Sequence, residues 1–140
     1  MIDIESVIPH REPIKIITQA VELQDDSGIA AAVVNERWPL FDGRTVHSIA
    51  LIEAVAQTAA LVEGYKRKKK GQDAIKGWMV GIKSAEFHRD VLDLQTCITV
   101  SIRRQCSFDD YAVINGTVTS GNETLLTAVL QAIRLNKDEG

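Results

Sequence analysis

The 140-residue sequence has little of what several protein classes depend on. It holds only two cysteines, Cys97 and Cys106, which are too few for a disulfide framework. Both fall in segments that alternate like strands, so we expect small buried side chains there rather than reactive thiols. The three histidines are far apart and show no spacing typical of a zinc site. The sequence also has no phosphate-binding glycine loop and no nucleophile elbow, so we predict neither a metal nor a cofactor.

Two further shortages concern charge and long apolar runs. Sixteen Lys and Arg face nineteen Asp and Glu, for a net charge of −3, and nucleic-acid binders usually carry a basic surplus. No apolar run reaches the roughly 18 residues of a membrane span, and the first residues lack the pattern of a signal peptide. We therefore expect a cytoplasmic protein with no nucleic-acid or membrane partner. The length suits a single domain over residues 1–140.

Residues 47–69 have the periodicity of one long helix. Apolar residues recur at i, i+3 and i+4, and the first turns are apolar nearly all round, so other structure must wrap this helix. Gly71 suits a helix cap. The basic run before it, residues 66–70, is either a solvated helix end that opposes the helix dipole or a docking patch for an acidic partner.

Strand signals surround this helix on both sides. The predicted strands are residues 14–23, 28–34, 76–87, 94–106, 111–119 and 124–135. This order of two strands, one helix and four strands predicts an α+β fold in which an antiparallel sheet curls around the helix. One sheet covers only part of so apolar a helix, so we expect a dimer.

Glu53 is the residue that carries most information about function. It stands on the apolar helix with no charged neighbour for several residues, and an ionised carboxylate is costly to bury unpaired. It must face a polar cleft, be hydrogen-bonded, or hold a proton near neutral pH, which suits a general acid or base. The other interpretation is an interface residue paired with an Arg. Gln57 lies one turn later on the same face and would orient either Glu53 or a substrate carbonyl.

The histidines are weaker candidates. His47 opens the predicted helix, either as the second half of an acid/base pair or as an exposed first-turn residue beside a possible cap, Ser48. His10 lies in a proline-bounded extended segment and His88 ends a strand, and both positions are typical of structural or solvated residues.

Three segments resemble the bacterial 3-hydroxyacyl-acyl-carrier-protein dehydratases. Residues 8–14 (Ile-Pro-His-Arg-Glu-Pro-Ile) resemble the N-terminal Leu-Pro-His-Arg-x-Pro segment of that family. Residues 41–44 (Phe-Asp-Gly-Arg) and 51–57 (Leu-Ile-Glu-Ala-Val-Ala-Gln) are similar to its Phe-Pro-Gly loop and Glu-Ala-x-Ala-Gln helix, and residues 81–87 to the strand that follows. The resemblance implies a hotdog fold, a curved antiparallel sheet of about six strands around one central helix. Such proteins are usually dimers with their sites at the interface.

One departure from that family concerns its catalytic His, which stands immediately before Phe-Pro-Gly. Here Leu40 takes that place, and Asp42 replaces the Pro. A divergent branch, the dehydratase-like proteins of aryl-polyene-type pathways, resembles this chain more closely. Glu53 therefore carries over from the family, whereas the partnering His does not.

The resemblance implies dehydration of a 3-hydroxyacyl thioester on acyl carrier protein, without metal or cofactor. Glu53 would act as the acid and His47 as the only local candidate base, while Gln57, Gly43 and Phe41 would contact substrate. Six residues separate His47 from Glu53, about 9 Å of helical rise, so the two would meet only across a dimer.

Two alternatives stay open. The first is a non-catalytic hotdog subunit that pairs with an active dehydratase, or that binds acyl carrier protein without turnover. The second is an acyl-CoA thioesterase. The expected assembly is a homodimer or a heterodimer with another hotdog subunit.

Overall fold

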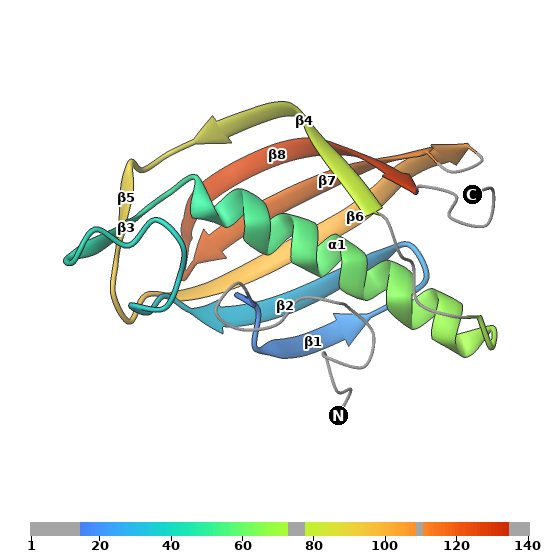
Figure 1. Ribbon diagram of the computed structural model, residues 1–140, viewed down its shortest axis with the longest axis horizontal. Coiled ribbons are helices and arrows are strands. Elements are labelled where there is room, and N and C mark those ends of the chain that lie inside the picture. Colours follow the sequence, from blue (N-terminus) through green and yellow to red (C-terminus); the bar gives the residue numbers. More distant parts are fainter. Residues whose placement is uncertain (1–14, 73–77, 109–110, 135–140) are drawn as a thin grey trace.

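One long helix and a curved antiparallel sheet make up the structure, a computed structural model that describes residues 15–72, 78–108 and 111–134 (Figure 1). In chain order the elements are β1 (Gln19–Leu23), β2 (Ser27–Val33), β3 (Thr45–His47), α1 (Ala50–Lys69), β4 (Trp78–Phe87), β5 (Val91–Asp93), β6 (Cys97–Phe108), β7 (Tyr111–Ser120) and β8 (Glu123–Arg134). Six of the strands form one sheet in the order β1-β2-β6-β7-β8-β4, and β3 pairs with β5 in a second sheet of two strands. The predicted α+β architecture is confirmed, and the short strands β3 and β5 are additions to it.

Helix α1 forms the centre of the core. It packs against β2, β6, β7 and β8, and the sheet curves around it (Figure 1). Leu51, Val55 and Val62 are at most 1% exposed, and on β6 the alternating residues Ile98 and Val100 meet them from the sheet side. Each fully buried aliphatic side chain of this kind contributes about 1.5–3 kcal/mol to folding. The helix is therefore held in place mainly by its contacts with the sheet.

Two glycines in the sheet set how closely α1 approaches it. A Cβ atom on Gly116 of β7 would collide with Cγ1 of Val55, and one on Gly28 of β2 would collide with Cγ2 of Val62. Val55 and Val62 are two helical turns apart and so point the same way. The absence of a side chain at these two glycines thus allows one face of α1 to pack closely against the sheet at two points.

The C-terminal end of the helix agrees with the sequence prediction, and the N-terminal end differs from it. At the C-terminal side, α1 ends at Lys69 and Gly71 follows with φ of 72°, as the cap prediction requires. At the N-terminal side, the predicted helix began at His47, but α1 begins at Ala50. The prediction was wrong there because His47 is in extended conformation, paired with Val91 of β5.

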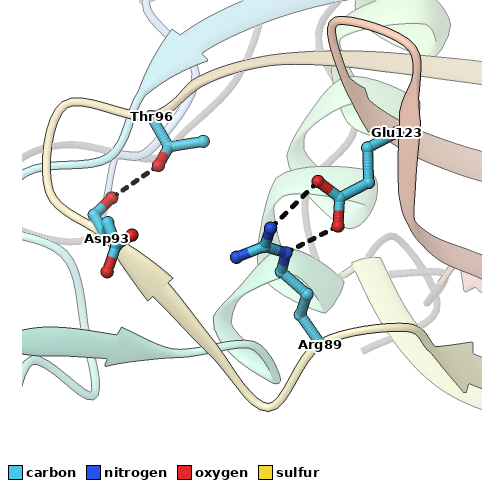
Figure 2. Close-up of polar contacts among 4 residues, drawn as sticks. All are labelled: Arg89, Asp93, Thr96 and Glu123. Carbon is cyan, nitrogen blue, oxygen red and sulfur yellow. Dashed lines mark hydrogen bonds and ion pairs between the residues drawn. The ribbon is translucent and has the colours of Figure 1, made fainter.

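The β3–β5 pair lies at the end of the molecule where α1 begins (Figure 1). Just before β5, Arg89 forms a two-point ion pair with Glu123 at the start of β8, with Nε–Oε2 of 2.6 Å and Nη2–Oε1 of 3.1 Å (Figure 2). Beyond β5, the Thr96 hydroxyl donates to the Asp93 carbonyl at 2.7 Å. These contacts fix both ends of β5, and through β5 they hold β3 and the start of α1.

Strand β4 is an edge strand whose helix-facing side α1 leaves uncovered. Its residues Ile82, Ala85 and Phe87 are register partners of buried residues on β8, and directly opposed residues share a face of the sheet. Nevertheless Ile82 is 53% exposed and Phe87 37% exposed. The concave face of the sheet therefore continues past the helix as an apolar strip, formed by Ile82, Ala85 and Phe87, which we call the β4 strip.

The two cysteines are exposed, not buried as predicted. Cys97 lies next to the buried Ile98 and therefore points to the outer face of β6. Cys106 follows a register shift in the same strand, between Arg104 and Cys106. Within the residues that the structure describes, no helix combines the length and apolar character needed to cross a membrane.

Candidate functional site

Glu53 and Gln57 form a hydrogen-bonded pair in the first turns of α1. The Gln57 side-chain amide donates to Oε2 of Glu53 at 3.1 Å, across one turn of the helix. Glu53 is half-buried. The helix thus presents a single carboxyl group of fixed orientation on an otherwise apolar face.

The side chain of Gln57 also accepts hydrogen bonds from the segment before β1. It is fully buried, and its Oε1 accepts backbone N–H bonds from Ile16 at 2.8 Å and from Ile17 at 3.3 Å. The segment before β1 therefore locks the side chain that positions Glu53. Of the two roles expected for Gln57, this geometry fits the orientation of Glu53, and contact with a substrate stays a prediction.

His47 ends β3 with its side chain exposed. Its Nδ1 accepts the backbone N–H of Ile49 at 3.1 Å, and its own backbone N–H donates to the Leu40 carbonyl at 3.2 Å. While Nδ1 accepts this bond its lone pair is occupied, which leaves Nε2 as the ring nitrogen available to other partners. The contacts described above for His47 and for Glu53 are with different residues, Ile49 and Leu40 for the first and Gln57 for the second.

Phe41 and Gly43 lie in a tight turn that leads into β3. Asp42 organises the turn: its Oδ1 accepts the backbone N–H groups of Arg44 at 2.9 Å and Thr45 at 2.8 Å. These two bonds lower the pKa of the Asp42 carboxyl group. Phe41 packs against the core, while Gly43 is exposed at the tip with φ of 98°.

Leu40 precedes this turn in an unusual backbone conformation. Its φ is 64° and it is 53% exposed, although a bulky residue seldom adopts positive φ. Such conformations cost of order 1–3 kcal/mol and occur often at functional sites. The sequence resemblance places Leu40 where the dehydratase family carries its His, and nothing in the sequence signalled its strained backbone.

The start of α1 lacks the predicted cap. Ile49 holds the cap position without a side-chain hydrogen bond, so the prediction that Ser48 caps the helix was wrong. Ser48 is 1% exposed, and among the described residues its hydroxyl has no hydrogen-bond partner. Its backbone is used instead, because its N–H donates to the Asp90 carbonyl at 2.9 Å and its carbonyl accepts from Leu51 at 2.9 Å.

The structure does not place the other two histidines near the Glu53–Gln57 pair. His10, with the whole segment 8–14, lies outside the described residues. His88 is exposed at the end of β4, where its backbone N–H donates to the Leu125 carbonyl at 3.0 Å. In the described part of the chain, no three His, Cys, Asp or Glu side chains gather in a group that would hold a metal ion.

Comparison with known proteins identifies relatives of the whole chain. The model of the ApeP-like family, described as ApeP dehydratase, matches residues 2–139. The 3-hydroxyacyl-[acyl-carrier-protein] dehydratase FabZ of Burkholderia cenocepacia is 30% identical over 135 residues, which are 87% of this chain and 86% of that protein.

Solved structures share the fold. A chain of the dehydratase heterocomplex ApeI:P from Xenorhabdus doucetiae superposes with a TM-score of 0.90 at 16% identity, covering 99% of this chain and 95% of that one. The PaaI protein of Escherichia coli superposes with a TM-score of 0.61 at 11% identity, over 83% of this chain and 82% of that one. The central helix, the six-stranded sheet and these relatives confirm the hotdog fold, and the chain belongs to the ApeP-like dehydratase family, which is related to the FabZ dehydratases.

Proposed function

We propose that the chain is a subunit of a 3-hydroxyacyl-[acyl-carrier-protein] dehydratase and that Glu53 is its catalytic carboxyl group. The observation that carries this proposal is the contact chain from the Ile16 and Ile17 amides through Gln57 to Glu53. A buried amide that is engaged at both ends fixes the carboxyl group before substrate arrives. Such preorganisation is what a proton-transfer group requires.

The reaction eliminates water across C2 and C3 of the acyl chain. A base takes the proton from C2, the C2–C3 double bond forms, and the C3–O bond breaks as Glu53 gives its proton to the leaving hydroxyl. Water leaves, and the proton on the base returns to Glu53. The positive end of the α1 dipole lies beside Glu53 and stabilises the negative charge that develops on the thioester oxygen.

We further propose that the base comes from a second hotdog subunit. The lone pair of His47 Nδ1 is occupied by the Ile49 N–H, so this nitrogen cannot take a substrate proton while that bond persists. The ApeI:P protein of X. doucetiae is named a dehydratase heterocomplex, which supports a partner of a different sequence. The β4 strip supports the same view, since Ile82 and Phe87 remain exposed in the single chain.

The test is mass spectrometry of 3-hydroxyacyl carrier protein, incubated with the chain alone and with the chain purified together with a second hotdog subunit. Loss of one water in the two-subunit sample is the expected result. Release of the acyl group instead would identify a thioesterase and overturn the proposal. An unchanged substrate in a sample that still binds carrier protein would show a non-catalytic subunit.

Substitution of Glu53 tests its role directly. Glu53→Gln keeps the size of the side chain and its bond to Gln57 but removes the transferable proton, so turnover falls by at least about 10²-fold. Glu36→Gln, on the exposed loop before Trp38, is the matched control and keeps full turnover. A Glu53→Gln enzyme with normal activity would remove Glu53 from the mechanism.

A further inference from the structure

The first turn of α1, which carries Glu53, has no side-chain cap of its own. Ile49 occupies the cap position without a side-chain hydrogen bond, so the backbone contacts that flank the helix start become more important. The Ser48 carbonyl accepts the Leu51 N–H at 2.9 Å. The Ser48 N–H in turn donates to the Asp90 carbonyl at 2.9 Å. The position of the first turn therefore depends on where Asp90 lies.

Two contacts directly before Asp90 join the connection between β4 and β5 to the first residues of β8. The His88 N–H donates to the Leu125 carbonyl at 3.0 Å. Arg89 then forms its two-point ion pair with Glu123 (Figure 2). A planar guanidinium that meets both oxygens of one carboxylate fixes a direction as well as a distance. The ion pair thus restrains the path of the backbone as it reaches Asp90.

Strand β5 provides a second connection between the ion pair and the helix. Its first residue, Val91, is the register partner of His47, which directly precedes Ser48. The next partners in this ladder, Val46 and Leu92, are at most 1% exposed. The two strands therefore cannot separate without exposing apolar side chains. A displacement of β5 carries β3 and the start of α1 with it.

We propose that the Arg89–Glu123 ion pair is a positioning element for Glu53. The restraint passes from the ion pair to the Asp90 carbonyl, from there to the Ser48 N–H, and so to the first turn of α1. Neither member of the ion pair touches substrate or transfers a proton. This inference rests on the proposed function, because it takes Glu53 as the group that transfers the proton.

Gln57 and the ion pair restrain different parts of Glu53. Gln57 holds the carboxyl group from the C-terminal side, through its bond of 3.1 Å to Oε2. The ion pair holds the backbone of the first turn from the N-terminal side. Proton transfer needs donor and acceptor atoms about 2.6–3.2 Å apart, and a misplacement of about 1 Å can cost about 10²-fold in rate. Loss of the ion pair therefore slows turnover.

The test removes the ion pair without changing the net charge, in the double variant Arg89→Gln/Glu123→Gln. The matched control is Asp25→Asn/Lys69→Gln, which removes the ion pair between the other end of α1 and the turn that joins β1 to β2. Lys69 and Asp25 are 52% and 54% exposed, against 49% and 45% for Arg89 and Glu123. Ion pairs this exposed contribute little to stability, so both double variants fold and lose similar stability.

Turnover is measured in the complex with the second hotdog subunit, on 3-hydroxyacyl carrier protein. Arg89→Gln/Glu123→Gln lowers kcat about tenfold and leaves KM unchanged, because the change affects the placement of Glu53 and not the binding of substrate. The complex with Asp25→Asn/Lys69→Gln keeps the wild-type kcat. A wild-type kcat in the first variant, or an equal loss in both, would overturn the proposal.

A second measurement needs no turnover and so separates this proposal from the proposed reaction. The side-chain carboxyl carbon of Glu53 gives its own NMR signal, identified by its loss in Glu53→Gln. This signal moves in Arg89→Gln/Glu123→Gln and keeps its position in Asp25→Asn/Lys69→Gln. An unmoved signal in the first variant overturns the positioning role, whether or not the complex is active. If the signal moves but the wild-type complex dehydrates nothing, the proposed reaction fails and the connection from the ion pair to Glu53 stands.

Discussion

Ser48 buries a hydroxyl group that has no partner among the described residues, and such a group costs about 1–3 kcal/mol. We therefore expect Ser48→Ala to raise the free energy of unfolding by about 1 kcal/mol, measured by urea denaturation. Thr58→Val is the control, because the buried Thr58 hydroxyl donates to the Ala54 carbonyl at 2.8 Å and its removal is destabilising. A loss of stability in Ser48→Ala would mean that this hydroxyl is bonded in solution.

The Arg89–Glu123 pair gives the stability a defined dependence on pH (Figure 2). The bond to Arg89 lowers the pKa of Glu123 from its ordinary value of 4.5. A lowered carboxyl pKa means that the stabilisation is complete above the unfolded pKa and is lost as pH falls through the folded pKa. Melting curves should therefore place wild type above Glu123→Gln at pH 7, with the gap closing below about pH 4. A gap that stays constant from pH 7 down to pH 2 would contradict this assignment.

At the scale of elements, the distance between α1 and β7 depends on Gly116. Gly116→Ala places a methyl group against Val55, and overpacking of this kind costs about 1–3 kcal/mol. Adding Val55→Ala removes the clash, so the double variant loses less stability than the two single changes added together. Gly81→Ala is the control, since a Cβ there meets nothing within 4 Å. Additive effects would show that the contact is not tight.

The long helix and the long strands could be predicted from the sequence, because burying one side of each element requires apolar residues at regular spacing. The alternation in β6 and the apolar stripe of α1 follow from the concave face and the helix that fills it. Strands β3 and β5 have three residues each, too few to show a period. The start of α1 was therefore placed three residues early, at His47 instead of Ala50.

The candidate site was predictable only where it depends on spacing within one element. Glu53 and Gln57 are one helical turn apart, so the sequence alone brings them together. The amides of Ile16 and Ile17 reach Gln57 from forty residues away, and backbone groups leave no residue-type signal. The same holds for Leu40, whose positive φ is set by the turn around it.

At the scale of the whole molecule, the β4 strip should be where a second subunit packs. We expect assembly to bury roughly 1,200 Å² or more in total. Ile82→Glu places a charge in the strip, so the mass from light scattering should fall to that of one chain at micromolar concentration. Val21→Glu changes an equally exposed apolar residue, 55% against 53%, on the opposite edge strand β1 and should leave the assembly intact. A single-chain mass for the wild type would contradict the expectation.

The free edge of β4 also makes the single chain prone to aggregation. Among the described strands, β4 is paired with β8 alone, and an unpaired edge with apolar side chains is a template for indiscriminate strand addition. A chain produced without the proposed second subunit should slowly form β-rich aggregates, with losses that grow with concentration. Its cellular yield should then be set by the supply of the other subunit, and co-expression should rescue it more than lower temperature does.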